Sequence, residues 1–233
     1  MKKKVVIAAH QPNFLPYLGL FYKIYKSDKF IFVDDVQFST QNGISHHRNY
    51  IKTPQGKLLI HVPVKRTSRS RINEAVIDYQ SNWISKMEKT MYLNYGKALC
   101  YEEVNDWLFG VLERKYEMLS DLNIALITEI SQKMGLGSDF DLSSKYVIDG
   151  TKEELVVNLI EFFGGDIYYS GTGAAAYLHE DSFAARGMEL VYSDYQPISY
   201  RQMWGESIDN LSVIDFLYNC GFVNPFCEGN GNA

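Results

Sequence analysis

Residues 5–52 read VVIAAHQPNFLPYLGLFYKIYKSDKFIFVDDVQFSTQNGISHHRNYIK. This stretch opens with an apolar run of strand length at Val5–Ala9, continues with helical spacing over Tyr17–Tyr25, and returns to an apolar run at Phe30–Val33. A strand, a helix and a second strand in this order are typical of a βαβ unit, in which the two strands are parallel. We therefore predict an α/β fold with an open, mostly parallel sheet.

Polar residues follow both of these strands. His10 and Gln11 end the first run, and Asp34 and Asp35 end the second. In open parallel sheets, ligands bind outside the carboxyl ends of the strands, so we predict the functional site at this edge. An imidazole titrates near neutral pH, and we assign His10 to proton transfer on a bound substrate. We expect Asp35 to act beside it as the ligand contact and Asp34 to cap the loop.

The remainder of the chain predicts further strands and helices. The turn sequence TPQG predicts a β-hairpin that pairs Arg48–Lys52 with Leu58–Val64. Apolar spacing and cap residues predict strands at Ile72–Tyr79, Asp166–Tyr169 and Glu189–Ser193, and helices at Trp83–Tyr95, Val104–Leu119, Asp121–Gly135, Thr151–Phe163 (capped by Thr151) and Leu211–Tyr218. Phe140–Ser144 fits neither pattern clearly. We predict one domain over residues 1–233, with a helical subdomain at 83–135.

Three further segments bear on ligand binding. Arg48, Asn49 and Lys52 are natural partners for phosphate or carboxylate oxygens. Ser170 and Gly171 follow a predicted strand in YYSGTG, where small residues let a backbone approach a phosphate or a sugar, although an ordinary turn uses the same residues. The basic segment at residues 65–71 (KRTSRSR) is interpreted as a solvated loop.

Composition limits the class of protein. The net charge of −5 over 233 residues argues against a general nucleic-acid binder. No segment approaches the roughly 20 apolar residues that a membrane span needs. The three cysteines are an odd number without metal-ligand spacing, which favours reduced thiols and a cytoplasmic location.

Metal and nucleophile motifs are absent from the sequence. His46 and His47, together with His10 and the two aspartates, offer donors that zinc or manganese accepts, but no H-x-x-x-H or H-E-x-x-H spacing exists, and we predict no metal site. No G-x-S-x-G elbow is present, and neither Cys100 nor Cys220 lies next to a base in sequence. A serine or cysteine hydrolase therefore has little support.

An ordered set of sequence blocks carries a family resemblance. From about Val6 to Gly221 the chain contains HQPNFLPYLGLFYKI, FVDDVQF, HRNYIKTPQG, VPV, INEAVID, YYSGTG and LSVIDFLYNCG, and in this it resembles the WbqC-like proteins. The resemblance implies an enzyme of bacterial surface-polysaccharide (O-antigen) biosynthesis that attaches an acyl or aminoacyl group, such as glycine, to a nucleotide-linked amino sugar. On the family pattern the matching polar positions are His10, Gln11, Asp34, Asp35, Gln37, Arg48, Asn49, Lys52, Asn73, Ser170, Gly171, Tyr177 and Gln202.

A looser topological likeness adds alternatives. A strand, a His/Pro loop and a helix also open the Rossmann-like nucleotidyltransferases that bind ATP, but their second histidine is missing here, where Tyr17 and Gly19 occupy the region. A nucleotidyltransferase that uses ATP with a divalent metal, and a non-catalytic sugar-nucleotide-binding protein, therefore remain open beside the transferase or amide ligase. The expected partner is a small nucleotide-sugar substrate, and a homodimer is compatible with the sequence.

Overall fold

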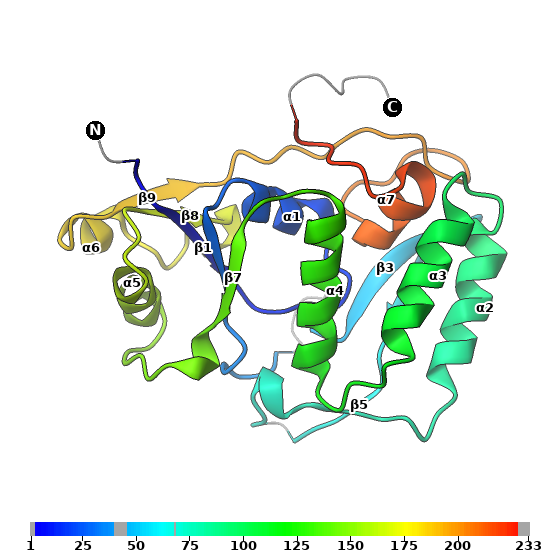
Figure 1. Cartoon of the computed structure of the whole chain (residues 1–233), viewed down its shortest axis with the longest axis horizontal. Coiled ribbons are helices and arrows are strands. Elements are labelled where there is room, and N and C mark those ends of the chain that lie inside the picture. Colours follow the sequence, from blue (N-terminus) through cyan, green and yellow to red (C-terminus); the bar gives the residue numbers. More distant parts are fainter. Residues whose placement is uncertain (1–2, 40–45, 68, 228–233) are drawn as a thin grey trace.

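A five-stranded parallel sheet forms the centre of the protein (Figure 1). The computed structural model describes residues 3–39, 46–67 and 69–227, and all five strands lie within them. From edge to edge the strands are β7, β2, β1, β8 and β9, with bounds Asp139–Leu142, Lys29–Phe32, Val6–His10, Ile167–Ser170 and Glu189–Tyr192. Every neighbouring pair is parallel, which confirms the predicted α/β class and the parallel sheet.

Helices cover both faces of the sheet. Successive side chains of a strand point to opposite faces, so a sheet covered on both sides needs apolar residues at consecutive positions. In β1, Ile7 and Ala9 join the apolar cluster beneath α5 and α6, whereas Ala8 joins the cluster that includes α1, α4 and α7. These helices span Glu153–Phe162 (α5), Glu180–Ala184 (α6), Leu18–Tyr25 (α1), Leu119–Lys133 (α4) and Val213–Cys220 (α7).

Three consecutive helices occupy the region predicted as a helical subdomain. They are α2 (Trp83–Tyr95), α3 (Tyr101–Leu112) and α4, and they run side by side in Figure 1. Met91 of α2 and Leu108 of α3 belong to the same apolar cluster as Phe30 and Phe32 of the sheet. The division of the chain into a single domain with a subdomain stays a prediction.

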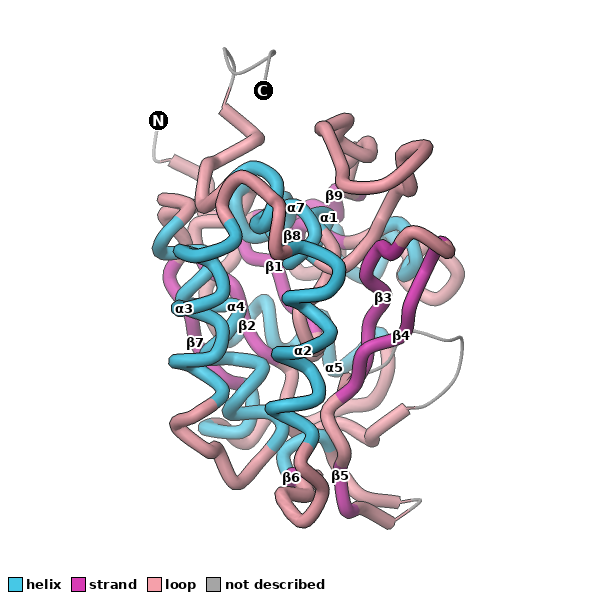
Figure 2. The backbone as a smooth tube through the Cα atoms, turned by 90° about the vertical axis from the view of Figure 1, so that its right-hand side faces the viewer, coloured by secondary structure: helices cyan, strands magenta, loops and turns pink. Residues whose placement is uncertain are grey.

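Two short antiparallel pairs lie beside the central sheet. The predicted hairpin is confirmed as β3 (Arg48–Thr53) paired with β4 (Gly56–His61), and Figure 2 shows it as a separate ribbon next to the central strands. The second pair joins β5 (Val64–Lys65) to β6 (Val76–Ile77). None of the described helices is both long and apolar enough to cross a membrane.

Some predicted elements are wrong. Most of the strand predicted at Ile72–Tyr79 is absent, and a 3-10 helix at Ile72–Glu74 (η1) precedes the two-residue β6. The backbone N–H groups of Ile72 and Asn73 donate to Val36 and Asp34 at 3.0 Å, so the loop after β2 uses the bonds that a strand partner would take. The helix predicted at Val104–Leu119 ends at Leu112 instead.

Other differences concern element ends. The unassigned segment Phe140–Ser144 contributes the edge strand β7 and the 3-10 helix η2 (Ser143–Lys145). Thr151 does not cap α5, whose N-cap is Lys152 with a φ of 53° and no side-chain cap. The small residues after β8, which the sequence offers either as a close approach to a ligand or as a turn, lead into a 3-10 helix at Thr172–Ala174 (η3).

Candidate functional site

The strand order creates a switch point between β1 and β8. The chain passes from β1 to β2 on one side of β1, whereas β8 and β9 lie on its other side. The ladder between β1 and β8 pairs only Val6 with Ile167 and Ile7 with Tyr168, while β8 stays paired with β9 as far as Ser170. The carboxyl ends of β1 and β8 therefore separate, and a crevice at such a point is the usual ligand site of an open α/β sheet.

A cavity of about 600 Å³ lies beside the separated carboxyl ends of β1 and β8, and we call it the switch-point cavity. Its volume lies in the range of small-molecule sites. One wall comes from α5 and the opposite end from the strand ends and the loop after β8. The lining residues are Ala9, His10, Gln11, Lys23, Val33, Val36, Ser143, Lys152, Leu155, Val156, Leu159, Tyr168, Ser170, Gly171, Gly173, Ala174 and Tyr177. It thus brings together five of the predicted site residues: His10, Gln11, Ser170, Gly171 and Tyr177.

His10 is held in one tautomer. Its Nδ1 atom lies 2.8 Å from the carbonyl oxygen of Gln11, which can only accept, so Nδ1 carries the proton of the neutral ring. The remaining nitrogen, Nε2, then carries a lone pair. Burial lowers the pKa of His10 to about 4, and the charge of Lys23 adds to this effect. At neutral pH the imidazole on the cavity wall is therefore uncharged with a free lone pair, and the expectation that His10 titrates near neutral pH is wrong because burial disfavours its charged form.

Lys23 is a buried lysine that the sequence prediction missed. Its Nζ atom donates to the backbone oxygen of Ala9 at 2.7 Å and lies 5.8 Å from the centroid of the Tyr168 ring. No carboxylate of the described residues lies within 4.0 Å of it. Burial lowers the pKa of Lys23 to about 7. A signal was present in the sequence, because Lys23 lies three residues after the buried Leu20 and so shares its face of α1.

The two aspartates after β2 have different surroundings. Asp34 is buried and accepts hydrogen bonds from the Ser144 backbone N–H at 3.2 Å and the Ser144 hydroxyl at 2.7 Å. Asp35 accepts from the hydroxyl of Ser143 at 2.5 Å. Ser143 lines the switch-point cavity and Asp35 lines a neighbouring one, so this hydrogen bond lies where the two cavities meet.

The neighbouring cavity has a volume of about 750 Å³, and we call it the outer cavity. It shares Val36, Lys152 and Leu155 with the switch-point cavity. Its other lining residues are Asp35, Gln37, Arg69, Arg71, Gly150 and Thr151. Gln37, predicted as a substrate contact, also forms an isolated antiparallel bridge with Arg71.

The remaining predicted residues line neither cavity. The Lys52 ammonium is buried and donates to the Gln202 side chain at 3.0 Å and to the backbone oxygen of Glu206 at 2.5 Å. Asn49 is also buried, and its amide donates to the Leu15 oxygen at 2.7 Å. Arg48 pairs with His61 in the hairpin register. Asn73 lies in η1. The assignment of these residues to substrate binding stays a prediction.

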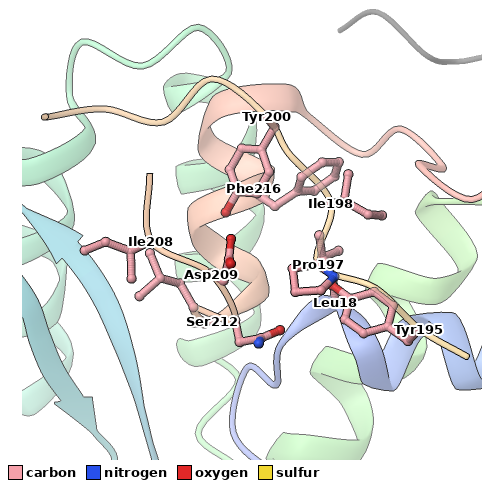
Figure 3. Close-up of a pocket in the computed structure, with 11 residues that line it drawn as sticks. Leu18, Tyr195, Pro197, Ile198, Tyr200, Ile208, Asp209, Ser212 and Phe216 are labelled. Carbon is pink, nitrogen blue, oxygen red and sulfur yellow. The ribbon is translucent and has the colours of Figure 1, made fainter. Parts of the chain in front are cut away.

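A third hollow lies between α1, α7 and the segment at residues 195–212 (Figure 3). Figure 3 shows Leu18, Tyr195 and Phe216 converging on it, and its volume is about 10 Å³. That volume accommodates at most about one water molecule. The nearby hydroxyl of Tyr200 donates to Asp215 at 2.7 Å, so this region is a packed junction and not a ligand site.

His46 and His47 are the two adjacent histidines that the sequence offers as metal donors. His46 is buried, with Nδ1 2.9 Å from the side-chain oxygen of Asn13, and its ring packs edge-on against Phe38. Within the described ranges, no three His, Cys, Asp or Glu side chains are arranged to hold a metal ion.

Comparison with known proteins identifies one family. The model of the WbqC-like protein family matches residues 11–225. The uncharacterized protein Rv1507c of Mycobacterium tuberculosis is 33% identical over 227 residues, which are 96% of this chain and 96% of that protein. No solved structure matches the chain.

Proposed function

Because the chain belongs to the WbqC-like protein family, which connects it with polysaccharide biosynthesis, we propose that it forms an amide on a nucleotide-linked amino sugar. The group transferred is an acyl or aminoacyl group such as glycyl. The enzyme is then a transferase if the donor arrives activated, or a ligase if ATP activates it.

The observation that carries this proposal is the state of His10. A neutral imidazole with its lone pair on Nε2, on the wall of a cavity of about 600 Å³ at the switch point, is suited to accept a proton from a substrate amine. Most of the wall is apolar, so a bound substrate would displace water from it, which limits hydrolysis of an activated acyl donor.

The free amine of the sugar attacks the carbonyl carbon of the activated acyl group, and a carbon–nitrogen bond forms. His10 Nε2 takes the proton that the nitrogen loses. The bond between the carbonyl carbon and its leaving group then breaks, and His10 returns the proton to that group or to solvent. The Lys23 ammonium supplies positive charge for the oxyanion that develops on the carbonyl oxygen.

Asp35 has a supporting role in this scheme. Its hydrogen bond with Ser143 lies at the junction of the two cavities. A carboxylate there can hold the ammonium form of the substrate before deprotonation. Asp34 is buried and already accepts hydrogen bonds from the backbone N–H and the hydroxyl of Ser144, so we give it no part in the reaction.

A combined binding and turnover screen tests the proposal. The purified protein is incubated with UDP- and dTDP-linked amino sugars together with acyl-CoA, or with glycine and ATP, and mass spectrometry follows the sugar nucleotide. We expect a product heavier by the acyl or glycyl group, in which the amine of the sugar has become an amide. Transfer of a nucleotidyl group from ATP would instead identify a nucleotidyltransferase. Binding of the sugar nucleotide without turnover of any donor would identify a non-catalytic binding protein.

A further inference from the structure

Three cations from two distant segments line the outer cavity. Arg69 and Arg71 come from the segment before η1, and Lys152 comes from the start of α5. In the described part of the chain, none of the three forms an ion pair within 4.0 Å, whereas Arg114 and Arg186 are paired with Glu129 and Glu161. The fold therefore places three cations without an ion-pair partner among the described residues at this cavity, although the whole protein has a net charge of −5. The Glu74 carboxylate, which accepts the Arg71 backbone N–H at 2.8 Å, is not part of the lining.

The single carboxylate in the lining does not cancel this charge. Asp35 accepts the Ser143 hydroxyl at 2.5 Å at the inner side of the cavity, toward the switch-point cavity. The three cations against one anion leave an excess of two positive charges in the lining. Focused positive potential in a cleft raises the local concentration of an anionic ligand.

The side-chain types indicate which anion fits. A guanidinium presents a planar fork of N–H donors that matches the oxygens of a phosphate, and a lysine adds a compact charge. Two arginines and a lysine around about 750 Å³ can accommodate a diphosphate. We infer that the outer cavity, through Arg69, Arg71 and Lys152, is the binding site for the phosphate groups of the substrate.

The shared wall gives the bound substrate a direction. Val36, Lys152 and Leu155 line both cavities, so a ligand with its phosphates in the outer cavity extends past Lys152 toward His10. The identity of that ligand as a sugar nucleotide rests on the proposed function, but the phosphate site itself does not. This site differs from the predicted phosphate contacts Arg48 and Lys52, which line neither cavity.

Calorimetric titration with inorganic pyrophosphate and with UDP tests the inference. We compare the wild type, the double variant Arg69→Gln/Arg71→Gln, and Arg201→Gln, an exposed arginine that lines neither cavity. Arg69 and Arg71 are exposed, so their replacement leaves the core intact. We expect the double variant to bind both probes at least about 30-fold more weakly, because it lacks the two guanidinium groups that donate charge-assisted hydrogen bonds to the phosphate oxygens. Arg201→Gln should stay within about twofold of the wild type, because Arg201 lines neither cavity and its loss removes no proposed phosphate contact.

The outcomes separate this inference from the proposed function. If the double variant binds pyrophosphate and UDP like the wild type, or if the wild type binds neither, the phosphate site is wrong. If the wild type forms no amide but binds pyrophosphate, and the double variant does not bind it, the phosphate site stands and the proposed function fails. If amide forms and the double variant keeps the wild-type KM, the proposed function stands and the phosphate site fails.

Discussion

The Nζ atom of Lys23 donates a hydrogen bond to the backbone oxygen of Ala9 at 2.7 Å. Successive carbonyl groups of a strand point to opposite sides, and the His10 oxygen bonds to Val33 after β2, so the Ala9 oxygen faces β8. The ladder with β8 has ended by this point. The lysine thus satisfies a backbone group exposed by the separation of the strands, and its charge lies on the wall of the cavity that results.

The lowered pKa of Lys23 should make the free energy of unfolding depend on pH between about 7 and 10.5. Burial lowers its pKa from 10.5 to about 7, so between these values the unfolded chain binds one more proton than the folded chain. Stability therefore rises with pH across this window and the penalty is full below pH 7. Relative to Lys23→Met, the wild type should gain about 1.4 kcal/mol per pH unit, measured by urea unfolding from pH 7 to about 10.

The apolar variant also removes the hydrogen bond to Ala9, but that loss does not depend on pH and shifts all points equally. The prediction therefore concerns the slope of the difference. A difference that is constant with pH would mean that Lys23 has an ordinary pKa in the folded protein.

Replacing Asp34 should lower the stability of the protein, whereas replacing Asp35 should lower its activity. Asp34→Ala removes the acceptor of the Ser144 N–H and hydroxyl in a buried place, so thermal or urea unfolding should show a loss of about 2 kcal/mol. Asp35→Ala should cost less than about 1 kcal/mol, because the Ser143 hydroxyl also lies 3.3 Å from Asp34. Asp35→Ala should instead slow amide formation. The reverse pattern, with Asp34→Ala stable but inactive, would move the ligand contact to Asp34.

A bulky residue at Gly173 should block the switch-point cavity. Gly173 lines this cavity, and an added Cβ would meet no atom within 4 Å. Gly173→Leu should therefore fold normally and bind the sugar nucleotide at least about tenfold more weakly, as calorimetry would measure. Gly110→Leu is the matched control, since Gly110 also has open space and lines neither cavity. Equal affinities in both variants would place the ligand elsewhere.

A Lys52 variant distinguishes the outer cavity from the sequence-predicted contact Lys52 as the place where phosphate binds. Its ammonium is buried and bonded to Gln202 and Glu206, so Lys52→Met should destabilise the protein by about 2 kcal/mol and leave UDP affinity within about twofold. Calorimetry on the folded variant gives the affinity, and urea unfolding gives the stability. Loss of UDP binding without loss of stability would restore the sequence-based assignment of phosphate to Lys52.

Much of the fold could be predicted because the signals are local. The apolar run at Val5–Ala9 and the hairpin turn TPQG each determine their element within a few residues. The strand predicted at Ile72–Tyr79 failed because the backbone N–H groups of Ile72 and Asn73 donate to the carbonyl oxygens of Val36 and Asp34, which lie 36 and 39 residues earlier in the chain. Such tertiary bonds leave no mark in a local pattern.

The site could be predicted only in part for a related reason. His10 and Gln11 could be placed because a polar residue after a buried strand is a local signal. Lys23 and the outer cavity depend on which segments meet in space. Arg69 and Arg71, in a segment interpreted as a solvated loop, reach Lys152 only through the folded chain. Conversely, Lys52 resembles a ligand contact in sequence but bonds to Gln202, 150 residues away.

The proposed role of His10 is to remove the proton from the substrate amine. The kcat of His10→Asn for amide formation distinguishes this role from a purely structural one. The asparagine amide can still donate to the Gln11 oxygen, as Nδ1 does at 2.8 Å, but it lacks the basic Nε2. We predict a kcat lower by at least about 100-fold, with substrate affinity within about threefold of the wild type. A variant that forms the amide at the wild-type rate would contradict the account, and His10 would then only hold the loop after β1.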